Sequence, residues 1–274
     1  MCFVMNVSLH GVPETMLIPL WARAYETQKG SPLVRDPIAV DLVSKLDYDF
    51  SKFKHARLSQ IGTAVRSNIL DRATKAFIHA HENAVCLNLA CGLDTRFERV
   101  KNGRVDWYNI DLPEGIELRE RLLTEVDPHT KNIAASIFDP AWINQIPHHD
   151  RPVLILMEGA SMYFRKEQME TLLQLLIEHF APATMLMEVM PPFLIRHQKH
   201  HDSVKRESAP FQWGVERGRD VLSLHPQLRL SWERTLYEGY RMHWGLLGIL
   251  SWIPWVNWNL NNKILCLKLL MRKS

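Results

Sequence analysis

The sequence is poor in cysteine and has no block of one charge. Its four cysteines, Cys2, Cys86, Cys91 and Cys266, lack the paired spacing of a zinc site. Cys86 and Cys91 fall in a predicted strand and turn, which favours a reduced cytoplasmic protein over a disulfide-bonded one. The formal net charge of +3 comes without a lysine- or arginine-rich block. The sequence therefore gives no electrostatic reason to expect nucleic acid as a partner.

The chain also lacks a long apolar run. Its N-terminus has no basic region followed by an apolar core, so no signal peptide is expected. Residues 246–258 are strongly apolar and hold three of the nine tryptophans, but they include Pro254. A helix that spans a bilayer needs about twenty residues, so this stretch is too short. We expect a helix and turn packed over the sheet here, and no membrane partner.

What the sequence does contain is an alternation of short apolar runs with helical segments. Apolar residues make up 46% of the 274 residues and charged residues 23%, as in soluble globular proteins. Strands are predicted at 85–89, 107–110, 132–137, 153–157 and 185–189, with further strand-like segments at 228–236 and 264–271. Intervening helices such as 166–180 predict an α/β fold with a mainly parallel sheet covered on both faces.

The leading part of the chain has helical periodicity and no evident strand. Ile61, Val65 and Ile69 share one face of residues 58–79, which predicts a long amphipathic helix. We therefore divide one domain of residues 1–274 into three parts. These are a helical cap (1–80), a ligand-binding core (81–190), and a final part (191–274) with a polar lid insertion and the two terminal strands.

The most informative stretch is the first predicted strand and the turn after it. Residues 85–89 lead through Gly92 into a segment that can start a helix. Backbone N–H groups converge at such a corner, so it binds phosphate or nucleoside groups. About twenty residues further on, the second strand ends in Asp111, where such folds place an acid that binds the ribose hydroxyls.

Three motifs in order resemble a known family. They are residues 88–97 (NLACGLDTRF), 109–113 (NIDLP) with Leu118 and Arg119 after it, and 158–164 (EGASMYF). They are similar to S-adenosylmethionine-dependent methyltransferases related to leucine carboxyl methyltransferase, above all its bacterial polyketide O-methyltransferase branch. The resemblance implies a Rossmann-like class I methyltransferase with a seven-stranded, mostly parallel sheet and an antiparallel hairpin at its edge. It implies S-adenosyl-L-methionine as methyl donor and a small-molecule acceptor.

The resemblance also gives roles to individual residues. It implies that Arg66 binds the carboxylate of S-adenosylmethionine, that Glu158 lies near its methionine moiety, and that Ser136 and Ile137 flank the adenine. The expected cofactor site thus comprises Arg66, Gly92, Asp111, Ser136, Ile137 and Glu158.

Three further residues are candidates for the acceptor side. The Tyr163 hydroxyl can steer an acceptor oxygen, which makes it the catalytic candidate, and Arg23 can contact cofactor or substrate. Tyr163 and His197 are the candidate bases for an acceptor that must lose a proton. The helical spacing of His197 with His200 and His201 resembles that of metal ligands, but the polar run around them, which holds both basic and acidic residues, favours a solvated face. We expect no metal.

Two residues of the turn depart from common patterns. The family usually has glycine where this chain has Ala90, and alanine is tolerated there if its φ is negative. A dinucleotide fold favours a small residue where this chain has Asp94, which disfavours a nicotinamide cofactor.

These observations predict a methyl transfer to oxygen. A carboxylate acceptor is already ionised and needs no general base, whereas a phenol or alcohol needs one. Two alternatives stay open, a non-catalytic protein that keeps the fold and a nicotinamide-dependent oxidoreductase.

Overall fold

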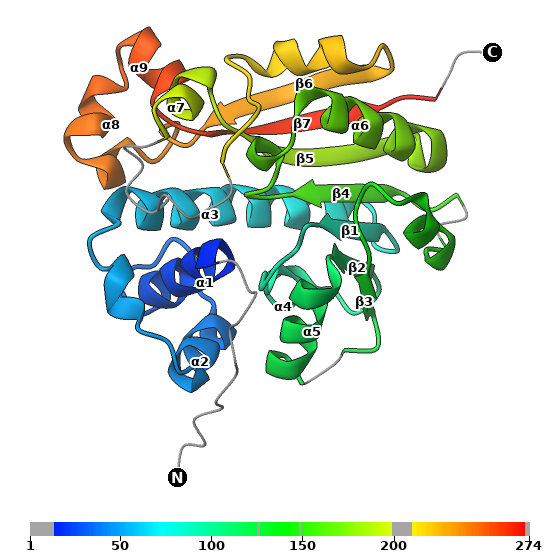
Figure 1. Ribbon diagram of the computed structural model, residues 1–274, viewed down its shortest axis with the longest axis horizontal. Helices are drawn as coiled ribbons and strands as arrows, with labels where there is room; N and C mark the ends of the chain where they lie inside the picture. The colour runs from blue at the N-terminus through cyan, green and yellow to red at the C-terminus, as the bar shows by residue number, and fades with distance from the viewer. Residues whose placement is uncertain (1–13, 125–126, 148–149, 199–209, 272–274) are drawn as a thin grey trace.

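The computed structural model describes residues 14–124, 127–147, 150–198 and 210–271 (Figure 1). Cys2, His200, His201 and part of the predicted lid insertion lie outside the described residues. The strands are β1 (Val85–Leu89), β2 (Asp106–Asp111), β3 (Thr130–Ala134), β4 (Val153–Met157), β5 (Ala183–Val189), β6 (Leu228–Thr235) and β7 (Lys263–Leu269). They form one seven-stranded sheet in the order β3-β2-β1-β4-β5-β7-β6.

The predicted topology is confirmed. The pairs among β1 to β5 are parallel, while β7 is antiparallel to both β5 and β6 and forms the edge hairpin. The third strand differs from the predicted 132–137, because it begins at Thr130 and ends at Ala134. The chain turns directly after this strand: the Asp139 N–H donates to the Ser136 carbonyl at 3.0 Å, which ends the extended backbone.

The helices fill both faces of the sheet, as the alternation predicts. They are α1 (Glu14–Thr27), α2 (Pro37–Lys45), α3 (Arg57–Ala80), α4 (Arg96–Val100), α5 (Pro113–Leu122), α6 (Lys166–Phe180), α7 (Pro192–Arg196), α8 (Leu246–Leu250) and α9 (Pro254–Asn259). Short 3-10 helices are η1 (Phe50–Phe53), η2 (Pro140–Gln145), η3 (Ser161–Tyr163), η5 (Gly218–Leu224) and η6 (Arg241–Trp244).

Alternate residues of β1 enter two separate cores. Leu87 and Leu89 pack in the cluster that contains the buried side of α6, whereas Cys86 packs in the cluster of α3 and α4. Side chains of a strand point alternately to opposite faces, so a strand buried on both faces is apolar throughout. This is why residues 85–89 are a nearly continuous apolar run, in which the buried Asn88 is the one polar residue.

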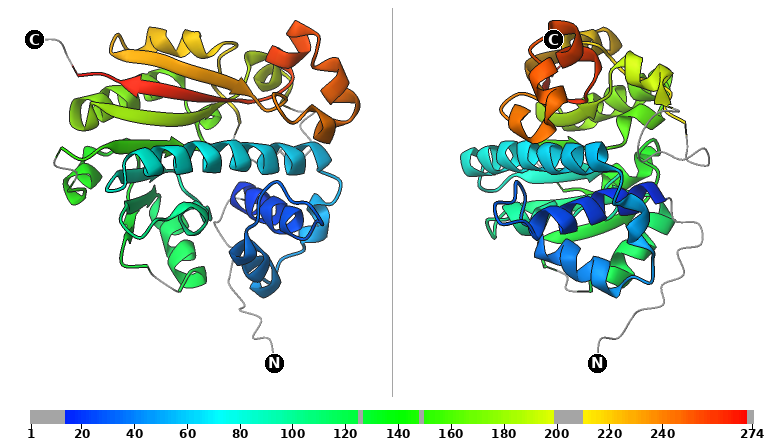
Figure 2. Two further views of the ribbon diagram at one scale, coloured as in Figure 1. Left: turned by 180° about the vertical axis from the view of Figure 1, so that it is seen from behind. Right: turned by 90° about the vertical axis from the view of Figure 1, so that its left-hand side faces the viewer.

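The leading helices pack against the core of the protein. Leu17 and Leu20 of α1 share a buried cluster with Leu42 of α2, with Leu93 after β1, and with Leu118 of α5. Figures 1 and 2 show α1 on one side and α8 on the other side of the N-terminal half of α3. The cap thus lies over the turn that follows β1.

Residues 246–258 correct one expectation. They form α8 and α9 rather than one helix and a turn, and most of their large side chains are not packed over the sheet: Leu246 is 71% exposed and Trp252 73%, whereas Val256 is buried. The apolar composition predicted burial, but these helices are too short to bury more than one side. Among the described residues, no helix is both long and apolar enough to cross a membrane.

Candidate active site

A cavity of about 560 Å³ lies where the parallel strands end. Residues from the ends of β1, β2, β4 and β5 form its floor, and residues of α1 and α3 form one wall. The cavity brings together most of the predicted site residues, namely Arg23, Arg66, Gly92, Asp111, Glu158, Tyr163 and His197. Ligands of open α/β sheets bind at this edge.

The turn after β1 uses two left-handed residues. Gly92 has φ +47° and Ala90 has φ +51°. Ala90 therefore does not meet the condition, a negative φ, under which alanine is tolerated at this position. The turn needs both residues in this conformation to bring the Gly92 N–H back onto β2, where it donates to Asp111 Oδ2 at 2.7 Å. An alanine in the left-handed region costs roughly 1–2 kcal/mol relative to an ordinary conformation.

We expect the substitution Ala90→Gly to raise the free energy of unfolding by about 1 kcal/mol, because glycine adopts this φ without a Cβ clash. Denaturant unfolding of the two proteins measures the difference. The matched control is Ala73→Gly: Ala73 is also partly buried but lies inside helix α3, so its replacement by glycine should destabilise the protein. Equal losses in both variants would contradict the strain at Ala90.

Two arginines fix the carbonyl groups of the same turn. Arg119 of α5 donates through Nη1 to the carbonyls of Gly92 at 3.2 Å and Asp94 at 2.6 Å. Arg23 of α1 donates through Nη2 to the Leu93 carbonyl at 2.9 Å. With three consecutive carbonyls held on the protein side, the loop keeps one shape. Arg23, predicted to contact a ligand, lines the cavity but is 2% exposed and is engaged in this support.

Asp111 ends β2 beside the turn. Its Oδ2 accepts from the Gly92 N–H and its Oδ1 accepts from the Leu112 N–H at 2.7 Å. Burial raises the pKa of Asp111 above its usual range, against the effect of these two backbone N–H groups. Each carboxylate oxygen has a second lone pair, so the group can accept two more hydrogen bonds from a ligand in the cavity.

A second polar centre lies on the opposite side of the floor. Arg66 of α3 donates through Nε to Glu158 at 2.7 Å, and its Nη1 lies 3.2 Å from Glu188. Glu188, in β5, is fully buried and also accepts from the Gly159 N–H at 2.8 Å. The sequence analysis missed Glu188. Its signal was an acid inside an otherwise apolar predicted strand, which is uncommon unless the acid is paired.

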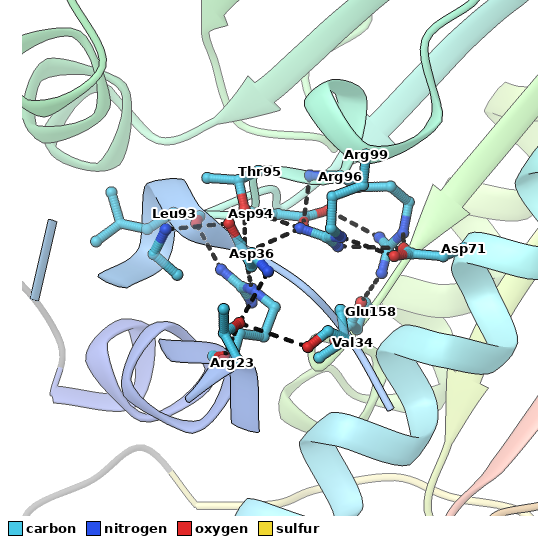
Figure 3. Close-up of polar contacts among 12 residues, drawn as sticks. Arg23, Val34, Asp36, Asp71, Leu93, Asp94, Thr95, Arg96, Arg99 and Glu158 are labelled. Carbon is cyan, nitrogen blue, oxygen red and sulfur yellow. Dashed lines mark hydrogen bonds and ion pairs between the residues drawn. The ribbon is translucent and has the colours of Figure 1, made fainter. Parts of the chain in front are cut away.

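Glu158 joins this centre to a larger network of charges (Figure 3). Arg96, which is fully buried, donates to Glu158 at 2.5 Å, to Asp94 at 2.7 Å and to Asp71 of α3 at 2.7 Å. Burial alone would raise the pKa of Glu158, but the guanidinium groups of Arg96 and Arg66 hold it below its usual value. Glu158 is therefore an anion fixed between two cations.

The network continues to the cap. Arg99 of α4 donates to Asp71 at 2.7 Å and to Asp36 at 3.0 Å, and Asp36 accepts from Arg23 at 2.8 Å. Asp36 precedes α2, where it also accepts from the Ala39 N–H and caps the helix. Positive and negative groups thus alternate from α1 to β4. The sequence analysis did not predict Asp71, Arg96 or Arg99, because pairing partners far apart in the sequence leave no local pattern.

The remaining predicted residues lie at the rim or outside the cavity. Tyr163 is half-buried with its ring 5.2 Å from the Phe211 ring, and burial raises the pKa of its hydroxyl. His197 is exposed and its Nδ1 lies 2.8 Å from the Phe193 carbonyl, so Nδ1 carries the proton of the neutral ring. Ser136 and Ile137 follow β3 at the same edge but do not line the cavity. Ile137 is packed in the core beside α6.

The side of the cavity away from Asp111 is apolar. Its lining includes Met162, Met190, Phe193, Leu194, Trp244 and Leu247. In the described part of the chain, no cluster of three or more histidine, cysteine or acidic side chains could hold a metal ion. Burial also raises the pKa of the Cys91 thiol far above its usual range, so it offers no thiolate. The polar floor and the apolar wall therefore suit a ligand with one charged and one apolar part.

Comparison with known proteins identifies the family. The family model for leucine carboxyl methyltransferase matches residues 16–177. The tetracenomycin polyketide synthesis O-methyltransferase TcmP from Streptomyces glaucescens is 34% identical to this chain over 234 residues. The match covers 85% of this chain and 86% of that protein. The S-adenosyl-L-methionine-dependent methyltransferase dpfgK of Gibberella zeae is 29% identical over 247 residues, 82% of each chain.

Solved structures agree on the fold. A candidate methyltransferase from Thermobifida fusca YX superposes with a TM-score of 0.57 at 17% identity, covering 92% of this chain and 94% of its own. A duf574 family protein from Streptomyces avermitilis gives a TM-score of 0.54 at 11% identity, covering 90% and 96%. At this identity the likeness concerns the fold alone.

Proposed function

This chain belongs to the leucine carboxyl methyltransferase family, and we propose that its acceptor is the carboxylate of an apolar small molecule. The protein is an S-adenosylmethionine-dependent O-methyltransferase, which confirms the predicted reaction and cofactor in place of the two alternatives. The cosubstrate supplies a methyl group on a positively charged sulfonium sulfur.

The cavity floor suits this cosubstrate. We assign the ribose hydroxyls to Asp111, whose oxygens keep free lone pairs, and the amino-acid carboxylate to Arg66. The described contacts of Arg66 use Nε and Nη1, which leaves Nη2 for a ligand. Gly159 lies beside that nitrogen, where an added Cβ would come within 3.4 Å.

The other cofactor contacts remain proposals of the same kind. Glu158, held as an anion, is placed to favour the positively charged methionine moiety. Gly92 lets the backbone of the turn come close to the ligand. Ser136 and Ile137 follow β3 at the ligand edge, and we retain the prediction that they flank the adenine.

The observation that carries the acceptor proposal is the state of the groups that could act as a base. Among the described residues that line the cavity, Glu158 and Glu188 are bound to arginine, Asp94 is bound to Arg96, Asp111 is assigned to the ribose, and the raised pKa of Tyr163 keeps its hydroxyl protonated. The exposed His197 is the remaining candidate base, and its replacement is part of the test below. A carboxylate needs no base.

The reaction then follows from position and charge. The acceptor oxygen forms the new bond to the methyl carbon while the carbon–sulfur bond breaks, and the electron pair of that bond goes to sulfur. A carboxylate and a sulfonium neutralise each other on the way, so a cavity that excludes water favours the step. The apolar wall supplies such surroundings, and the neutral Tyr163 hydroxyl can donate a hydrogen bond that aligns the acceptor oxygen.

Comparing a carboxylic acid with the phenol of the same ring skeleton tests the acceptor class. We expect labelled methyl from S-adenosylmethionine to appear in a base-labile ester of the acid. The variant His197→Ala should methylate the acid at the same rate as the unchanged enzyme. Tyr163→Phe should lower turnover by roughly tenfold to a hundredfold and leave the affinity for S-adenosylhomocysteine unchanged.

The contrary result is equally clear. Transfer to the phenol alone, abolished in His197→Ala, would mean a hydroxyl acceptor with His197 as its base. A loss of S-adenosylhomocysteine binding in Tyr163→Phe would mean that the Tyr163 hydroxyl contacts the cofactor and not the acceptor.

The buried thiols of Cys86, Cys91 and Cys266 support a reduced cytoplasmic setting for the enzyme.

A further inference from the structure

An exposed apolar face covers η6, α8 and α9. Met242 is 94% exposed, Leu246 71%, Ile249 68% and Trp252 73%, and Leu250, Ile253 and Trp255 are also exposed. Figures 1 and 2 show α8 and α9 together at an outer corner of the protein, beside the N-terminal end of α3. So many exposed large apolar side chains on adjoining elements indicate an interaction site rather than ordinary surface.

The segment that carries the apolar face has no acidic side chain. Residues 239–262 contain no aspartate, glutamate or lysine, and their basic side chains are Arg241 and His243. The Arg241 guanidinium lies 4.3 Å from the centre of the Trp252 ring, so a cation sits directly on the apolar face.

His243 also borders a second cleft, of about 410 Å³, on the cap side of α3. Lys29, Lys54 and Arg57 line this cleft together with the buried Glu26, which is bound to Lys29 at 2.6 Å. The apolar face is therefore bordered by a group of basic side chains.

This charge pattern decides between two occupants. In a symmetric pair of copies, the same face meets itself, so Arg241 and His243 of one copy would approach those of the other. The segment has no acid to pair with them, and like charges across an interface are unfavourable. Anionic lipid headgroups, in contrast, complement the basic side chains while the tryptophans and aliphatic side chains enter the acyl boundary.

We propose that the apolar face of η6, α8 and α9 binds to the surface of an anionic lipid membrane. Helices α8 and α9 have five and six residues and lie on the membrane surface without crossing it. The expectation of no membrane partner rested on these side chains being packed over the sheet, and their exposure removes that reason.

The position of the apolar face links it to the cavity. Trp244 and Leu247 line the cavity, and they belong to the same η6 and α8 that carry the exposed Met242 and Leu246. The Phe193 ring, in the cavity wall, lies 5.0 Å from the Trp255 ring. A membrane bound to this face would lie next to the apolar side of the cavity. If the acceptor is apolar, as the proposed function has it, it could enter from the lipid phase.

Vesicle co-sedimentation of the full chain tests the proposal. We expect binding to vesicles of phosphatidylcholine with phosphatidylglycerol, weaker binding to phosphatidylcholine alone, and loss of at least roughly tenfold in affinity in the double variant Ile249→Ser and Trp252→Ser. The matched control is Trp232→Ser, because Trp232 is 37% exposed on β6, outside the apolar face.

Two measurements keep the result interpretable. The affinity for S-adenosylhomocysteine should be the same in the double variant as in the unchanged protein. Equal affinity shows that the variant is folded, and it shows that a loss of vesicle binding is not a loss of the cofactor site of the proposed function. Light scattering after size exclusion gives the oligomeric state. The proposal is overturned if no vesicle composition binds the protein, if the control loses as much affinity as the double variant, or if the protein is a dimer that the double variant dissociates.

Discussion

Replacing Asp111 with alanine is expected to reduce the affinity for S-adenosylhomocysteine by at least roughly a hundredfold, because charge-assisted hydrogen bonds to both ribose hydroxyls are lost. The change also removes the acceptor of the Gly92 N–H, so the turn loses its connection to β2. Calorimetric titration measures the affinity, with NADH run alongside as the ligand that should not bind.

The control for this prediction is Glu114→Ala. Glu114 is a nearby carboxylate in the first turn of α5, but it is exposed and its loss should leave the affinity unchanged. Unaltered binding of S-adenosylhomocysteine to Asp111→Ala would show that the ribose lies elsewhere and that the assignment of the cavity floor is incorrect.

Replacing Arg96 with methionine is expected to destabilise the protein by about 3–5 kcal/mol, because it leaves three carboxylates without their shared buried cation. In a chain of this size, such a loss lowers the melting temperature by roughly 10 °C. Arg104→Met is the control. Arg104 also pairs with a glutamate, Glu82, but both are exposed, and such a pair contributes little.

The same substitution has a predictable dependence on pH. In the unchanged protein, the pKa values of Asp94 and Glu158 lie below their ordinary values, so these groups stabilise the fold at neutral pH and lose that contribution as the pH falls through their folded pKa values. Arg96→Met lacks the contribution already. The stability gap between the two proteins should therefore be largest near neutral pH and shrink in acid below about pH 4. A gap that is constant with pH would indicate lost packing instead of lost charge pairing.

Local patterns were sufficient for most of the fold. The runs at 85–89 and 153–157 and the helix at 166–180 were predicted with the bounds that the structure has. Burial of a strand on both faces leaves a nearly continuous apolar run, and burial of one helical face leaves a clear periodicity. Composition could not tell whether the apolar stretch after Gly245 is covered, because exposure depends on what lies next to a helix in space.

The site was predictable to the extent that its residues follow strand ends. Asp111 and Glu158 each come directly at or after a buried strand, and parallel strands end at one edge. The partners of Arg96 could not be predicted, because Asp71 lies 25 residues before it and Glu158 lies 62 residues after it. The departure at Ala90 was visible in the sequence, but the sequence could not show whether the turn keeps a left-handed conformation at this alanine or changes shape.

The alternating charges from Arg23 to Glu158 have a consequence for engineering. A designer who exchanges the first eighty residues with those of a relative, to alter which acceptor is methylated, also exchanges Asp36 and Asp71, the counterions of Arg99 and Arg96. A transplanted segment that lacks these two acids would leave buried guanidinium groups uncompensated, and the chimera would fail to fold before its selectivity could be assayed. The segment that would be exchanged to change the acceptor thus also contains side chains that the fold requires. Chimeras that fold should keep both aspartates and vary the residues that face the apolar wall.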